Sequence, residues 1–337
     1  MFRRRQPGQR SQLSHRQINR LLPFTNAPLF HALQLLATGD SARFHMPGHK
    51  GEPLFNSYAE VFAIDFTETY GTGNLYLSDG PIRDAEVAAA RYFGASDCFF
   101  LTGGSTQGIL SMLATAVGRG GAVLLDRECH KSVCHACALL DITPYFISAP
   151  VLEPFGISGA LAPADAEQQL IDHPEIRAVL LTSPTYYGVR RAIPAFVDLC
   201  RAYGKQLLVD AAHGAHFPAV GLPTPVAEGA DLAVLSIHKT LPCLGQGAVV
   251  LSGPGVDKRA LRENTALFGT SSPSYPIMAS IDLARAYTEG PGRAAYRRAA
   301  ETCGELREYV LRRTGFTPLT LEDYPALDPC RLTVCTA

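Results

Sequence analysis

Short apolar runs alternate with segments of helical amphipathic spacing along most of the chain. The apolar runs expected to form strands are residues 98–102, 122–126, 178–185, the start of 206–216, 232–236 and 247–252. Helical spacing of apolar positions predicts helices at 27–40, 80–95, 193–204, 277–290 and 292–315, and two more are expected after GGSTQG and RECHKS. Strands that are apolar throughout are typical of a parallel sheet buried on both faces. Because strands alternate with helices, we predict a three-layer α/β/α fold with a mostly parallel sheet.

Composition narrows the choice of partners. The 337 residues are 47% hydrophobic, with 30 basic and 31 acidic residues, so the chain can bury a large core and has no overall charge that attracts nucleic acid or a membrane surface. No run of 18 apolar residues occurs, so we expect no membrane span. Residues 1–22 are expected to be a poorly ordered basic tail of a cytoplasmic chain, and the nine cysteines are expected to be free thiols.

Polar residues follow several of the predicted strands. In sheets of this kind, ligands bind beyond the carboxyl ends of the strands. The candidates at these positions are Gly103, Gly104, Ser105 and Thr106, then His130, then Asp210 and His213, and then Ser236, His238 and Lys239. The glycines and hydroxyls before a helix suit a phosphate group, but neither the spacing of a Walker loop nor that of a dinucleotide-binding loop is present.

One cofactor, pyridoxal 5′-phosphate (PLP), explains these residues together. PLP requires a lysine for its Schiff base, a carboxylate that keeps the pyridine nitrogen protonated, and a ring that stacks on the pyridine. We assign these roles to Lys239, Asp210 and His130, all three of which we predict to be catalytic. The residues expected to hold the phosphate are Ser105, Thr106, Ser236 and His238.

Each of these residues also has an ordinary structural explanation. A single lysine is most often a surface residue, an aspartate can cap a helix, and a histidine such as His213 is often part of a core. The segment 129–137 also suggests zinc, with candidate ligands Cys129, His130, Cys134, His135 and Cys137. Because no second ligand pair has zinc-finger spacing, we expect no metal. The only basic clusters are the tail and residues 297–313, so we expect no nucleic-acid partner.

Taken together, the motifs resemble the ornithine/lysine/arginine decarboxylase family of fold-type I PLP-dependent enzymes. The resemblance runs from about residue 27 to the end of the chain. It rests on these segments in family order: RFHMPGHKG (43–51), DFTETYGTGNLYLSDGPI (65–82), GGST, RECHKS, SPTYYG, DAAHGAH, SIHKTLP and GTSSPSYPIMASID (269–282). This chain departs from the family pattern at Gly103, Ala211 and residues 190–192, none of which removes an assigned group.

The resemblance implies a PLP-dependent transferase-like fold and the same site residues. Lys239 matches the lysine that carries PLP, Asp210 the partner of the pyridine nitrogen, and His130 the stacking ring. The positions that match the cofactor pocket are Gly104, Ser105, Thr106, His213, Ser236 and His238. Ser271 and Ser272 match a segment that approaches the cofactor from the neighbouring subunit, so a homodimer or a larger homo-oligomer is implied.

The implied reaction is the decarboxylation of a basic amino acid, arginine, lysine or ornithine, to CO2 and a di- or polyamine. Lys239 or His238 would return the proton to Cα. The residues leave two alternatives open: an aminotransferase or lyase with the same cofactor, and a catalytically weak remnant that binds PLP.

The resemblance also divides the chain. Residues 23–290 are expected to form the large PLP-binding domain, and 291–337 a linking helix and the start of a smaller C-terminal domain that is largely missing. We therefore expect a truncated family member that is slow or inactive alone. Its last residues, RLTVCTA, have the pattern of a strand that lacks its sheet.

Overall fold

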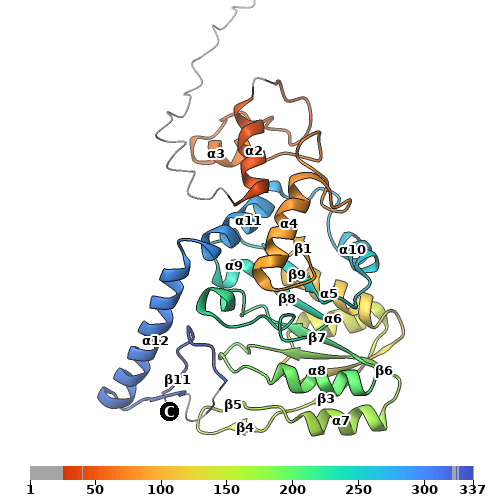
Figure 1. The fold of residues 1–337 in the computed structure, drawn as a ribbon, viewed down its shortest axis with the longest axis vertical. Helices are drawn as coiled ribbons and strands as arrows, with labels where there is room; N and C mark the ends of the chain where they lie inside the picture. Colours follow the sequence, from red (N-terminus) through yellow and green to blue (C-terminus); the bar gives the residue numbers. More distant parts are fainter. Residues whose placement is uncertain (1–25, 40, 321–323, 325, 337) are drawn as a thin grey trace, which may run out of the picture.

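A sheet of seven strands lies at the centre of the computed structural model, which describes residues 26–39, 41–320, 324 and 326–336 (Figure 1). The strand order is β1-β9-β8-β7-β6-β2-β3. The bounds are β1 (Asp97–Leu101), β2 (Ala122–Asp126), β3 (Thr143–Ile147), β6 (Ile176–Thr182), β7 (Gln206–Asp210), β8 (Leu232–Leu235) and β9 (Ala248–Ser252). The predicted mostly parallel sheet is therefore confirmed.

Two features of the sheet were not predicted. β9 runs antiparallel to both of its neighbours, β1 and β8, whereas the other neighbouring pairs are parallel. The strand β3 is absent from the sequence prediction because it lies at the edge and three of its five residues are exposed. An edge strand therefore lacks the continuous apolar run that marks the buried strands.

Helices cover both faces of the sheet. Alternate residues of the buried strands enter different clusters: in β8, Leu232 and Val234 pack on one side, and Ala233 and Leu235 on the other. The helices on the first side are α5 (Gly104–Ala116), α6 (Lys131–Leu140) and α10 (Lys258–Leu267). Those on the second side are α2 (Pro28–Thr38), α4 (Gly80–Phe93), α7 (Pro163–Asp172), α8 (Ile193–Ala202) and α11 (Tyr275–Glu289). This arrangement confirms the three-layer prediction.

The N-terminal helix α2 is joined to α11 by hydrogen bonds to a buried carboxylate. The backbone N–H groups of Leu29 and Phe30 donate to the carboxylate of Asp282, at 2.9 and 3.3 Å. Arg285 donates to the same carboxylate at 2.7 Å. The short helices η1 (Asn56–Tyr58) and α3 (Ala59–Ile64) follow at the same end of the molecule (Figure 1). The predicted disordered tail, 1–22, lies outside the described residues.

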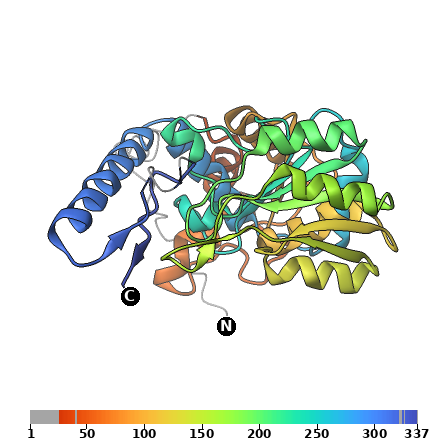
Figure 2. The ribbon, with the colours of Figure 1, turned by 90° about the horizontal axis from the view of Figure 1, so that it is seen from below.

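The C-terminal part leaves the sheet along α12 (Arg293–Arg313) and returns toward it (Figure 2). The expectation that the last strand lacks a partner is wrong, because β11 (Val334–Cys335) pairs antiparallel with β10 (Thr317–Pro318). The remaining elements are β4 (Val151–Leu152), β5 (Ile157–Ser158), η2 (Phe217–Val220) and α9 (Ile237–Thr240). Within the described ranges, no helix is both long enough and apolar enough to cross a bilayer.

Candidate active site

The predicted lysine and carboxylate lie at one edge of the sheet. Asp210 is the last residue of β7, and β7 pairs in parallel with β8, with Asp210 opposite Val234. Immediately after β8, Ser236 is the N-cap residue of the single-turn helix α9, which carries Lys239. The strand register therefore brings the two residues together although they are far apart in the sequence.

The Lys239 amine contacts an imidazole and not a carboxylate. Its Nζ lies 3.2 Å from Nε2 of His213. Within the described parts of the chain, no carboxylate oxygen lies within 4.0 Å of this amine, the limit for an ion pair. Partial burial lowers the pKa of Lys239, Asp210 opposes that shift, and Arg331 adds to it. The amine is thus more readily neutral than a solvent-exposed lysine, as a nucleophile needs.

Asp210 is a buried carboxylate that lacks a cation. The residue is 4% exposed, and its Oδ1 accepts a hydrogen bond from the backbone N–H of Ala212 at 3.1 Å. Burial raises the pKa of Asp210 more than the charges of Lys239 and His130 lower it. Over the described residues it forms no ion pair within 4.0 Å. A carboxylate in this state favours a ligand that brings a positively charged N–H.

His130 caps helix α6. Its Nδ1 accepts the backbone N–H of Ser132 at 3.3 Å and lies 2.7 Å from the Ser132 hydroxyl. Desolvation lowers the pKa of His130, and the charges of Asp210 and Lys239 act on the ring with opposite signs. The capping contact fixes the imidazole beside these two residues, where a neutral ring can lie against an aromatic ligand.

Hydroxyl groups meet at the start of helix α5. The Oγ atoms of Ser105 and Ser236 are 2.5 Å apart, although one follows β1 and the other follows β8. Gly104 has a φ of 71°, which favours glycine, and its N–H donates to the carbonyl of Gln246 at 2.9 Å. Thr106 is exposed in the same turn. A helix N-terminus lined by hydroxyls is a suitable place for a phosphate.

His238 is held by one ring nitrogen. Its Nδ1 lies 3.0 Å from the carbonyl oxygen of Gly247. Since a carbonyl only accepts hydrogen bonds, Nδ1 carries the proton, and Nε2 is the nitrogen available to a ligand. This contact places the ring in the turn that also holds Lys239.

Ser271 and Ser272 are not brought to this group of residues. Both are exposed, in the segment between α10 and α11. Their neighbour Thr270 accepts a hydrogen bond from Tyr76 at 3.0 Å. The role predicted for them, in the site of a neighbouring subunit, stays a prediction.

Two residues without a predicted role extend the site. Nη2 of Arg331 lies 3.5 Å from Nδ1 of His213, and its guanidinium carbon lies 5.6 Å from the ring centroid of Tyr186. The rings of Tyr186 and His213 meet edge to face, with centroids 5.6 Å apart. Tyr186 belongs to the SPTYYG motif, which could have suggested it. No sequence pattern links Arg331 to the site, because it lies 118 residues from His213.

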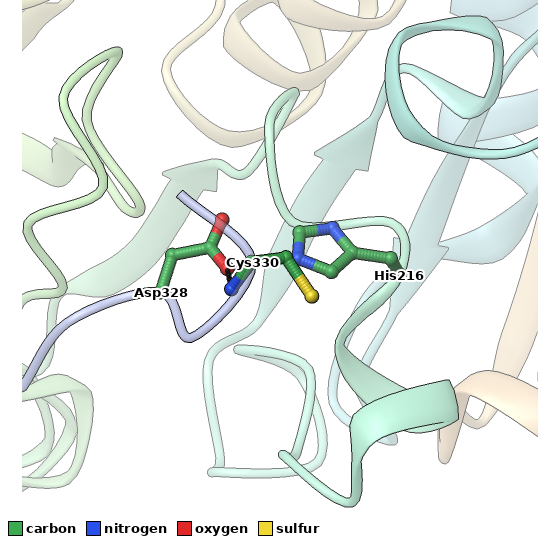
Figure 3. Close-up of side chains that lie close together, drawn as sticks. All are labelled: His216, Asp328 and Cys330. Atoms are coloured by element: carbon green, nitrogen blue, oxygen red, sulfur yellow. Dashed lines mark hydrogen bonds and ion pairs between the residues drawn. The ribbon is translucent and has the colours of Figure 1, made fainter. Parts of the chain in front are cut away.

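The zinc candidates of segment 129–137 do not form a metal site in the described structure. Burial raises the pKa of Cys129 to about 12 and that of Cys137 to about 11, which disfavours the thiolates that bind zinc. A different group, His216, Asp328 and Cys330, has ligand atoms within 4.8 Å of one another (Figure 3).

That group is already engaged in internal contacts. Nε2 of His216 lies 2.9 Å from Oδ1 of Asp328, and the backbone N–H of Cys330 donates to the same oxygen at 2.9 Å. Burial also raises the pKa of the Cys330 thiol to about 12. We interpret the His216–Asp328 pair as a clasp that holds the C-terminal segment to the sheet.

The family model for the major domain of Orn/Lys/Arg decarboxylases matches residues 27–336. The chain belongs to this family. Among relatives of this Orn/Lys/Arg decarboxylase-family chain, the uncharacterized protein YaaO of Bacillus subtilis is 36% identical over 78% of this chain and 57% of its own length. The arginine decarboxylase of Halalkalibacterium halodurans is 30% identical over 84% of this chain and 60% of its own length. The chain thus spans less than two thirds of these relatives.

Solved structures agree with the fold of the family. The lysine decarboxylase LdcF of Francisella novicida matches 95% of this chain and 53% of its own, with a TM-score of 0.82 and 21% identity. A structure described as SPT with PLP matches 68% of this chain and 56% of its own, with a TM-score of 0.55 and 18% identity. The family fold is therefore shared with a protein that binds PLP.

Proposed function

We propose that the chain uses PLP to decarboxylate arginine, lysine or ornithine to the corresponding amine and CO2. The observation that carries the proposal is that Lys239, whose pKa is lowered, and Asp210, a buried carboxylate without an ion-pair partner among the described residues, lie at the same edge of the sheet. A carbonyl compound with a protonated ring nitrogen would fit both residues, since Lys239 would hold its carbonyl carbon and Asp210 would pair with its ring N–H. The names of the relatives support a basic amino acid as the substrate.

The residues at the strand ends fit PLP part by part. Lys239 would attach it, Asp210 would hold the proton on the ring nitrogen, and His130 would lie against the ring. The residues assigned to the phosphate and its surroundings are Gly104, Ser105, Thr106, His213, Ser236 and His238. When bound, PLP supplies an electron-withdrawing ring system that stabilises the negative charge left at Cα when CO2 departs.

The chain's own groups then handle the proton. His213 has its pKa lowered to about 4, chiefly by burial, so its imidazole is neutral at pH 7 and can orient the amine of Lys239. We assign the return of the proton at Cα to Lys239 Nζ, with His238 Nε2 as the second candidate donor. We also propose that a second copy of the chain completes the site through Ser271 and Ser272.

The test uses the purified chain reconstituted with PLP. Reduction with borohydride and peptide mapping are expected to find pyridoxyl on one lysine, and incubation with L-arginine, L-lysine or L-ornithine is expected to yield CO2 and the matching amine. A keto acid product would favour an aminotransferase instead. PLP attachment without release of CO2 from any of the three substrates would contradict the proposed activity.

His130→Ala is expected to weaken PLP binding about fivefold, since a stacked ring contributes about 1 kcal/mol beyond its buried area. The dissociation constant for PLP, measured by absorbance titration, tests this. The matched control is His135→Ala, which removes an exposed imidazole from the same helix. Equal losses in the two variants would mean that His130 has no special contact with the cofactor.

A further inference from the structure

Two cysteines flank the start of helix α6, and neither has a part in the proposed reaction. Cys129 precedes His130, the N-cap residue of α6, and Cys134 is the fourth residue of the helix. The residue before an N-cap and the fourth residue of a helix often pack against each other. His130 has the extended backbone that allows this contact, with a φ of −66° and a ψ of 148°. The Cys129 thiol is accordingly hydrogen-bonded to that of Cys134.

The two thiols differ in their surroundings. All nine cysteines lie among the described residues, and of these only Cys134 is exposed. It also lines a surface cavity of about 350 Å³ beside β3, together with Asp141 and Phe146, so a small reagent can reach it. Cys129 is half-buried, and its backbone N–H donates to the carbonyl of Asp126 at 3.0 Å in the turn after β2. Burial raises the pKa of Cys129 to about 12, so Cys134 is the thiol that reacts first.

We propose that Cys129 and Cys134 form a reversible disulfide by exchange with a small disulfide such as oxidised glutathione. The thiolate of Cys134 attacks one sulfur of the reagent, whose S–S bond breaks, and the first glutathione leaves with the electron pair. The thiolate of Cys129 then attacks Sγ of Cys134, and the second glutathione leaves. The two protein thiols are thereby oxidised, and the reagent is reduced to two thiols that take up the two protons. Excess reduced glutathione reverses both steps.

The disulfide acts on His130, which lies inside the loop that it closes. An S–S bond of about 2.05 Å is much shorter than the separation of two thiols in non-bonded contact, so oxidation draws Cys129 toward the first turn of α6. The same loop contains the Ser132 hydroxyl, 2.7 Å from Nδ1 of His130, which orients the ring. The next step rests on the proposed function. A displaced ring would lie less well against PLP, so oxidation should weaken PLP binding about fivefold, as expected for His130→Ala.

The first measurement needs no cofactor. The PLP-free chain is treated with oxidised glutathione, its remaining thiols are alkylated, and its peptides are mapped by mass spectrometry. We expect a Cys129–Cys134 bridge that reduced glutathione removes, and no bridge in Cys134→Ser. The matched control is Cys137→Ala, which removes a buried thiol from the same helix and should keep the bridge. A mixed disulfide that stays on Cys134, or a bridge from Cys134 to Cys137, would overturn the proposal.

The second measurement compares PLP titrations of the reduced and oxidised chain. We expect the oxidised wild type to bind PLP about fivefold more weakly, and the treatment to leave the affinity of Cys134→Ser unchanged. Because linkage is reciprocal, saturating PLP should lower the equilibrium constant for disulfide formation in a glutathione buffer by the same factor. Equal PLP affinity of the reduced and oxidised wild type would overturn the link to His130. If neither form binds PLP, the proposed function fails, whereas the mapped bridge still decides whether the two cysteines pair.

Discussion

Lys239→Ala is expected to lower kcat/KM for decarboxylation by about a thousandfold or more, because removal of an enzyme's nucleophile costs at least that much in comparable cases. Lys239 is the basic side chain that follows β8 into the site, and its lowered pKa makes the neutral amine available. The variant should lose both the covalent attachment of PLP and the return of the proton at Cα. Steady-state amine production and borohydride labelling measure the two losses separately.

Lys131→Ala is the matched control for this prediction. Lys131 is exposed at the start of α6 and is near enough for its charge to affect the pKa of His130, so it is a second lysine beside the site. Its removal should leave the label on Lys239 and turnover within a few-fold of the wild type. A pyridoxyl group mapped to Lys131 in the wild type, or full turnover by Lys239→Ala, would rule out the assignment of the nucleophile.

Local patterns in the sequence predicted the layers of the fold and the position of Asp210 and Lys239 at the ends of neighbouring strands. An apolar run that ends in a polar residue marks both β7 and β8, and parallel pairing then places Asp210 and Lys239 at one edge. The helix predicted at RECHKS is α6, and the structure adds that His130 caps it. These features depend on short segments whose periodicity is visible in one sequence.

What the sequence could not predict depends on contacts between distant segments. The edge strand β3 is mostly exposed and has no apolar run, and the antiparallel direction of β9 depends on how its connections pack. Arg331 reaches His213 only because a turn held by Asp328 docks on the loop that contains Gly188. Such docking leaves no periodic pattern in the chain. The assignment of Ser271 and Ser272 requires a second copy of the chain.

Asp210→Asn is expected to lower kcat by roughly a hundredfold or more while leaving the fold intact. An amide has nearly the shape of the carboxylate, but it carries no charge to hold the proton on the cofactor's ring nitrogen, and loss of one such preorganised electrostatic partner typically costs several kcal/mol in the transition state. Single-turnover decarboxylation measures the effect. An exposed aspartate, Asp198 on α8, supplies the control substitution Asp198→Asn, which should leave kcat unchanged.

Asp210→Asn should lower kcat, but without PLP it should not lower the free energy of unfolding of the chain. Burial raises the folded-state pKa of Asp210 above its unfolded value, so ionised Asp210 destabilises the fold, and the penalty grows as pH rises between those two values and is complete above the folded pKa. Asp210→Asn removes this penalty. Without PLP, the variant should therefore be at least as stable as the wild type in urea at pH 7, with a smaller difference at acidic pH.

With PLP, the wild type should gain more stability than the variant, because only the wild type has the carboxylate that pairs with the ring nitrogen. A PLP-free variant that is less stable at pH 7, or one that retains near wild-type kcat, would show that Asp210 is a structural residue and not the partner of the cofactor.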